Sequence, residues 1–97
     1  MVVISKSTLV NYGKKNVQTI EAINEWYEKV NDAQWKHLAD IKKDFNTVDY
    51  VGNDRFVFNL KGNKYRIIAM IHFTTRTLYI RFIGTHAAYD KINASII

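Results

Sequence analysis

The stretch from Arg55 to Tyr89 constrains the fold more than any other part of this chain. Over these thirty-five positions there is no Asp or Glu, and β-branched and aromatic residues recur at short intervals. Such residues are typical of strands, so the stretch predicts a β-sheet. It also carries six basic side chains, which are Arg55, Lys61, Lys64, Arg66, Arg76 and Arg81. A cationic sheet with aromatic side chains indicates a surface for a polyanion, and nucleic acid is the first candidate.

The charge of the chain is divided unevenly between its two halves. Residues 1–54 hold seven lysines and eight carboxylates, a net of −1, whereas residues 55–97 hold seven Lys or Arg and one carboxylate, Asp90, a net of +6. This asymmetry indicates a directed electrostatic surface. Charge alone leaves open the alternative of a basic domain without an anionic ligand. The length of 97 residues and the 47% of hydrophobic residues predict one domain, residues 1–97, with a core of its own.

The composition also limits the chemistry that we expect. Without cysteine there is no disulfide framework, no thiolate metal site and no thiol nucleophile. No two histidines have metal-ligand spacing, so we expect neither a metal nor another cofactor. The first residues lack the apolar region of a secretion signal, and the longest apolar run, Ile67–Ile71, is too short to span a bilayer. We therefore expect a cytoplasmic protein without a membrane partner.

Before the sheet, the sequence predicts one short strand and three helices. Residues 2–4 read as the strand, and Ser5 or Ser7 can cap a helix that ends near Gly13. A second helix starts near Asn16, with an apolar face made of Ile20, Ile23, Tyr27 and Val30 beside Trp26. A third is expected around residues 34–45, followed by a loop over residues 48–53 with a turn at Gly52 and Asn53.

Within the sheet, the turn residues predict strands at 55–60, 64–73 and 78–84, and a short C-terminal helix at 86–93. A two-residue hairpin at Gly62 and Asn63 places Val57 opposite Ile68 and Asn59 opposite Arg66. A second hairpin at Thr75 and Arg76 places Met70 opposite Arg81, and His72 opposite Tyr79.

Alternation along these strands separates two faces of the sheet. The apolar face, which the N-terminal helices are expected to cover, carries Phe56, Phe58, Leu60, Tyr65, Ile67, Ala69, Ile71, Phe73, Leu78, Ile80 and Phe82. The opposite, uncovered face carries Arg55, Asn59, Lys61, Lys64, Arg66, His72, Tyr79 and Arg81, with Val57, Ile68, Met70 and Ile83 among them. The sequence therefore predicts an α+β fold with helices packed on a mainly antiparallel, twisted sheet.

A group that could perform chemistry stands where the sheet ends. His86, Tyr89 and Asp90 are spaced i, i+3, i+4, so one helical turn brings them together. RNA supplies its own nucleophile, the 2′-hydroxyl, and its cleavage needs a base, an acid and cations for the charge on phosphorus. His86 is suited to proton transfer near neutral pH, with Tyr89 or Asp90 as its partner. Arg66 and Arg81 could hold the phosphate by bidentate hydrogen bonds.

Each of these residues also has a purely structural interpretation. A single histidine at a strand end is more often a surface or capping residue than a catalyst, and Asp90 could pair with Lys91 or with an arginine of the sheet. His72 lies within a strand and is interpreted as structural or RNA-contacting. His37 is assigned no role.

The residues in several segments resemble the HigB family of toxins. These are the run Phe56–Arg66, then Tyr79–His86, then Tyr89–Lys91, together with Ile4–Leu9, the pair Trp26 and Tyr27, and residues 35–42. The resemblance extends over essentially the whole chain, and the combined pattern is specific where a single hairpin would not be. A departure occurs after Lys36, where relatives often carry a flanking proline and this chain has His37 and Leu38.

The resemblance implies a RelE-like fold and the toxin of a type II toxin–antitoxin module. Such a toxin is an endoribonuclease that cleaves mRNA, typically on the translating ribosome, and a HigA-type helix-turn-helix antitoxin silences it. Operator DNA would be bound only through the toxin–antitoxin complex. The basic sheet positions of the family fall on Lys64, Arg66 and Arg81, and its C-terminal site falls on His86, Tyr89 and Asp90.

These arguments give one preferred hypothesis and two alternatives. The preferred one is an mRNA endoribonuclease with catalytic residues Arg66, Arg81, His86, Tyr89 and Asp90, and RNA-binding residues Arg55, Lys61, Lys64 and Arg76. The first alternative is an adaptor that binds RNA or DNA without cleaving it. The second is an inactive protein that retains only the binding of an antitoxin.

Overall fold

A five-stranded sheet lies at the centre of the computed structural model, which describes residues 1–97. The strands are β1 (Val2–Ile4), β2 (Asp49–Gly52), β3 (Arg55–Leu60), β4 (Tyr65–His72) and β5 (Thr77–Thr85), in the order β1-β5-β4-β3-β2. β1 is parallel to β5, and the other neighbours are antiparallel. The predicted α+β fold with a mainly antiparallel sheet is confirmed.

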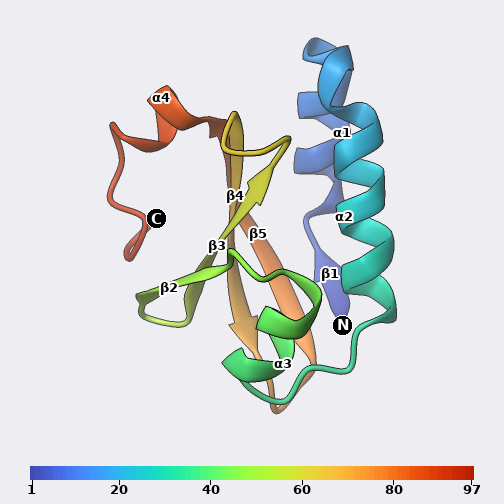
Figure 1. The fold of residues 1–97 in the computed structure, drawn as a ribbon, viewed down its shortest axis with the longest axis vertical. Helices are drawn as coiled ribbons and strands as arrows, with labels where there is room; N and C mark the ends of the chain where they lie inside the picture. The colour runs from blue at the N-terminus through green and yellow to red at the C-terminus, as the bar shows by residue number, and fades with distance from the viewer.

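The helices lie on both sides of this sheet. They are α1 (Lys6–Lys15), the 3₁₀ turn η1 (Val17–Thr19), α2 (Ile20–Asp32), α3 (Leu38–Asp44) and α4 (His86–Tyr89). Figure 1 shows α1 and α2 along one side of the sheet, and α4 with the C-terminal segment on the other. The N-terminal helices therefore cover one face, as predicted, while the chain returns at its end to the opposite face.

The main core fills the space between the helices and the apolar sheet face. Phe58 is at its centre, with ring centroids 5.3 Å from Trp26 and 5.2 Å from Phe45, both in edge-on contact. Ile23 and Val30 of α2 are buried there, as their spacing predicts. Ile20 was predicted on the same buried stripe, but this residue, the first of α2, is 42% exposed.

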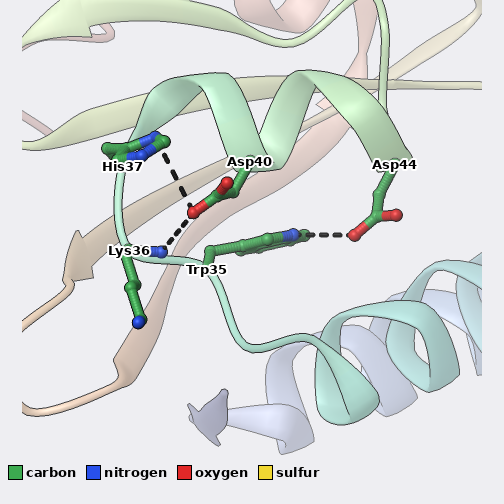
Figure 2. Close-up of polar contacts among 5 residues, drawn as sticks. All are labelled: Trp35, Lys36, His37, Asp40 and Asp44. Atoms are coloured by element: carbon green, nitrogen blue, oxygen red, sulfur yellow. Dashed lines mark hydrogen bonds and ion pairs between the residues drawn. The ribbon is translucent and has the colours of Figure 1, made fainter.

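Helix α3 begins later than the sequence predicts. It starts at Leu38 instead of near residue 34, because the residues before it are held by side-chain contacts in a non-helical path. Figure 2 shows the indole Nε1 of buried Trp35 donating to Asp44 Oδ2 over 2.8 Å, and the backbone N–H of Lys36 donating to Asp40 Oδ2 over 2.8 Å. His37, which was assigned no role, lies 3.7 Å from the same Asp40 oxygen.

The loop predicted over residues 48–53 is wrong, because Asp49–Gly52 forms strand β2 at the sheet edge. This strand pairs with β3 through Tyr50 opposite Phe56 and Asp49 opposite Val57. The turn that follows places Asn53 and Asp54 at φ angles of 51° and 62°. Two consecutive residues with positive φ are typical of type I′ hairpin turns, in which Asn and Asp are favoured.

The predicted pairing of β3 with β4 is confirmed. Val57 lies opposite Ile68, and Asn59 lies opposite Arg66. The connection is longer than two residues, since Leu60 and Tyr65 form the last pair. Lys61 and Gly62 both have positive φ, and the Lys64 N–H donates to the Lys61 carbonyl over 3.4 Å.

The predicted pairing of β4 with β5 is wrong. Met70 lies opposite Tyr79, and His72 lies opposite Thr77. Ile68 pairs with Phe82 while Ala69 pairs with Ile80, so Arg81 is an extra residue in β5, a β-bulge. A single extra residue reverses the alternation beyond it. As a result Ile83 joins the main core, and Phe82 moves to the opposite face, where it packs against Val57 and Ile68.

The sequence predicted that the opposite face is uncovered, and this prediction is wrong. Ala94 is buried against Val57 and Ile68, and Ile92 and Ile97 pack around this small cluster. Asn53 Nδ2 donates to the Ser95 carbonyl over 2.8 Å, which fastens the segment after α4 to the β2–β3 turn. The C-terminal segment therefore covers the middle of this face. It does not cover the end of the face near α4.

Candidate catalytic site

Helix α4 is fixed to the end of the sheet by two hydrogen bonds and follows a closely packed glycine. Thr85 is its N-cap, and the Thr85 Oγ1 accepts a hydrogen bond from the Ala88 N–H over 3.1 Å. The His86 N–H donates to the Lys64 carbonyl over 3.1 Å, which joins the start of α4 to the turn before β4. Gly84, the residue opposite Arg66, is buried, and a Cβ there would lie 2.6 Å from the Phe82 ring. The backbone of β5 thus delivers His86 beside Lys64 and close to Arg66.

The three residues predicted to share one helical turn do lie together. His86 Nδ1 is 3.0 Å from Asp90 Oδ2. The rings of His86 and Tyr89 meet edge-on, with centroids 6.4 Å apart. The side chains of His86 and Asp90 are 45% and 59% exposed, so a substrate can reach them. With Nδ1 at the carboxylate, Nε2 is the ring nitrogen that is available to a bound molecule.

Arg66 joins this group from strand β4. Its guanidinium carbon lies 4.6 Å from the centre of the Tyr89 ring, within the range of a cation–π contact. Nε is buried without a hydrogen-bond partner, and the guanidinium donates to no other group of the protein. The stacking on Tyr89 holds the side chain in place while leaving its terminal amino groups to a ligand. A guanidinium held in this way is suited to a phosphate.

Arg66 also lines a polar cleft. It has a volume of about 270 Å³ and is lined by Asn46, Thr47, Val48, Asp49, Val57, Asn59 and Arg66. The cleft lies between the sheet and the connection from α3 to β2, and Asp49, the first residue of β2, is part of its lining. Arg66 therefore borders both the cleft and the His86–Tyr89–Asp90 group.

Two of the predicted basic residues lie apart from Arg66. Arg81 is in the bulge, three residues from Gly84, which corresponds to about 10 Å along the strand. Its Nε donates to the Ile97 carbonyl oxygen over 3.2 Å. Arg55 donates to the same oxygen from Nε and Nη2, over 3.3 and 3.0 Å. The predicted partnership of Arg66 and Arg81 on one phosphate is thus not present in this conformation, in which Arg81 is held with Arg55.

The remaining basic residues are more dispersed. The exposed Lys64 lies beside His86 through its backbone contact. Lys61 reaches the helix side of the molecule, where its Nζ donates to the Gln18 carbonyl over 2.9 Å. Arg76 is in the β4–β5 turn, next to β1, and its carbonyl accepts from the Val2 N–H over 2.7 Å. That turn is at the far end of β5 from His86, on the order of 30 Å along the strand.

Sequence reasoning did not select several residues that shape this site. Asn59 had been placed opposite Arg66, so the pairing contained the signal that it lies near the site. Thr85 follows the usual preference for an N-cap, which could have identified its role in starting α4. Asn46, Thr47 and Asp49 had no local signal, because they lie in the connection before β2 and at the start of β2, a strand that had been interpreted as a loop.

None of the helices is long and apolar enough to cross a membrane.

Comparison with known proteins agrees with the resemblance described above. Residues 19–92 match the HigB toxin family, described as the RelE-like toxic component of a toxin–antitoxin system. The mRNA interferase HigB of Escherichia coli O6:H1 (strain CFT073) is 26% identical over 94 residues, which are 95% of this chain and 91% of that relative. The mRNA interferase toxin HigB of Escherichia coli K12 is 44% identical over 39 residues, which are 40% of this chain and 38% of that relative.

Proposed function

Because the chain belongs to the HigB family of RelE-like toxins of toxin–antitoxin systems, we propose that it is an endoribonuclease that cleaves mRNA. The observation that carries this proposal is the arrangement at the α4 end of the sheet. A guanidinium stacked on Tyr89 lies beside an imidazole whose Nδ1 is 3.0 Å from a carboxylate. The named relatives, both mRNA interferases, support the same activity.

In the proposed mechanism, Nε2 of His86 accepts the proton of the ribose 2′-hydroxyl. The 2′-oxygen then forms a bond to phosphorus, and the bond from phosphorus to the 5′-oxygen breaks, which leaves a 2′,3′-cyclic phosphate. Asp90 holds the imidazole in the required tautomer and stabilises its protonated form. Arg66 binds the phosphate oxygens, on which negative charge develops. The departing 5′-oxygen takes a proton from Tyr89 or from a water molecule beside it.

Other residues and partners complete the proposal. Lys64 binds the RNA next to His86, while Arg55, Arg81, Lys61 and Arg76 act at a distance from the reacting phosphate. Since RNA supplies the nucleophile, the mechanism requires no metal. The substrate is mRNA on the translating ribosome, and the antitoxin is of the HigA type, with operator DNA bound only by the complex. All of this is carried by one toxin domain, residues 1–97, in the cytoplasm.

The decisive experiment compares two histidines of the same protein. We expect His86→Ala and Arg66→Ala to lower the rate of mRNA cleavage by about a hundredfold to a thousandfold, the range for loss of a base or of a charge-stabilising donor. His72→Ala is the matched control, because His72 is exposed and also contacts a tyrosine, Tyr79, with centroids 5.7 Å apart. It should stay within about twofold of the wild type.

Primer extension on mRNA, with and without ribosomes, measures the new cleavage ends. Circular dichroism shows whether each variant stays folded. If the wild-type protein binds mRNA but creates no new ends, it is the adaptor considered above. If it neither cleaves mRNA nor arrests growth when expressed alone, it is the inactive partner of an antitoxin.

A further inference from the structure

A second surface lies between α1 and α2, on the side of the sheet away from α4 (Figure 1). Here the two helices leave an apolar groove of about 160 Å³. Its buried lining consists of Leu9, Gly13 and Ile23, and the lining residues that reach solvent include Val10 and Ile20. None of the residues assigned to the catalytic site takes part in it.

Several apolar side chains in and next to the groove are exposed to solvent. Val10 is 45% exposed and Ile20 is 42% exposed, and Val17, in the turn between the helices, is 69% exposed. The helices are already closely packed at this end, since a Cβ on Gly13 would lie 3.1 Å from Ile20 Cγ1. The helix pair therefore cannot close over these side chains. Clustered apolar side chains of this kind indicate a surface that another molecule covers.

The two charged residues that line the groove, Lys6 and Lys14, are both basic. Lys6 lies at one end, with its Nζ 4.1 Å from the centre of the Tyr27 ring, and Lys14 lines the other end. The lining contains no carboxylate. Lys6 and Lys14 are eight residues apart on α1, which corresponds to about 12 Å along the helix axis. A complementary ligand would have an apolar centre between two negative charges about two helical turns apart.

We propose that this groove binds an acidic amphipathic helix of a protein partner, with one large apolar side chain in the groove and carboxylates at Lys6 and Lys14. The volume suits a single group, because an apolar cavity of about 150 Å³ in another protein holds one benzene molecule. Under the proposed function, the partner that binds this groove is the antitoxin. Only the identity of the partner rests on that function. The antitoxin binds the helix pair and leaves Arg66 and His86 uncovered by this contact.

The charges favour this occupant over two others. A second copy of the chain in a symmetric dimer would bring the same lysines towards each other, which is repulsive. RNA would find cations at the rim but mainly apolar side chains between them, which bind neither a base edge nor a phosphate. An acidic helix satisfies both the apolar centre and the two ammonium groups.

The test measures binding of the purified HigA-type antitoxin of the proposed function by isothermal titration calorimetry. Val10→Glu should weaken binding by at least about thirtyfold, because it places a negative charge in the apolar contact. Ile96→Glu is the matched control: Ile96 is also apolar and is 68% exposed, but it lies in the C-terminal segment. It should stay within about twofold. Lys6→Ala with Lys14→Ala should reduce the dependence of binding on salt, and Lys43→Ala should not.

A second variant and a second measurement keep the outcome clear. Ile20→Glu replaces Val10→Glu if that variant does not fold, as judged by circular dichroism. The inference is overturned if the antitoxin binds both glutamate variants at the groove as tightly as the wild type. It is also overturned if Val10→Glu abolishes self-association in sedimentation, or RNA binding, instead. Cleavage of mRNA by the protein alone is scored separately, so loss of the proposed activity and loss of this binding site are distinguishable.

Discussion

A histidine and a tyrosine lie together near each end of the sheet, and only one of these pairs has the neighbours that the proposed catalysis needs. His72 and Tyr79 meet edge-on at 5.7 Å near the β4–β5 turn, and His86 and Tyr89 meet edge-on at 6.4 Å in α4. The second pair has in addition Asp90 at 3.0 Å from the imidazole and the Arg66 guanidinium 4.6 Å above the tyrosine ring. Under the proposed function, the two pairs differ not in residue type but in the carboxylate and the cation, which contact only the pair in α4.

The two ends also differ in what holds the arginines. Arg66 is positioned by an aromatic ring and donates to no protein acceptor, while Arg55 and Arg81, in the middle of the face, converge on the Ile97 carbonyl oxygen. Two guanidinium groups that already share an acceptor have fewer donors to offer to RNA. The end near α4 is therefore where we expect the reacting phosphate.

After the histidine comparison given above, the next largest effect is expected at the two tyrosines. Tyr89→Leu removes the ring on which Arg66 stacks, a contact that contributes about 1–2 kcal/mol when partly buried. We expect mRNA cleavage to slow by roughly tenfold, whereas Tyr79→Leu changes it by less than about twofold. Single-turnover cleavage assays measure both. Tyr89→Phe retains the stack, so if it is as slow as Tyr89→Leu, the hydroxyl and not the ring is the important group.

A smaller effect is expected at the carboxylate that distinguishes the two pairs. Asp90→Asn removes the charge beside His86, and because both side chains are about half exposed, the pair contributes less than about 1 kcal/mol. We expect cleavage to slow by roughly fivefold and folding to be unchanged, in the same single-turnover assay. If Asp90→Asn cleaves mRNA at the wild-type rate, His86 does not depend on a neighbouring carboxylate, which His72 also lacks.

The smallest expected effect is on the thermal stability of the fold in acid, and it concerns Asp40, which belongs to neither end of the sheet. It shows how much of any pH dependence comes from the fold and not from the two histidine pairs. Asp40 accepts a hydrogen bond from the Lys36 backbone N–H, which, with the electrostatic effect of His37 and Lys43 nearby, holds the pKa of its carboxyl below the usual value. A depressed carboxyl pKa stabilises the fold above the ordinary pKa of aspartate, and this stabilisation is lost as pH falls through the lowered value. Tm measured from pH 6 to pH 2 should fall more for the wild type than for Asp40→Asn. Parallel curves for the two proteins would contradict this assignment.

The sequence by itself determined the features that depend on near neighbours in the chain. Alternation gave the apolar face of β3 and β4, the pairing of Asn59 with Arg66 is confirmed, and the i, i+4 spacing brought His86 to Asp90. Each of these follows from the repeat of a strand or a helix, which is visible in a short window of residues. The concentration of cations after residue 54 was likewise a property of the sequence alone.

The tertiary structure decided how those cations are divided. The bulge at Arg81 reversed the faces of Phe82 and Ile83, and the C-terminal segment held Arg55 and Arg81 at Ile97. Strand β2 completed the cleft beside Arg66. These features depend on contacts between segments that are distant in the chain. The position of the extra residue in β5, for example, is fixed by packing on both faces of the sheet. No local repeat contains that information.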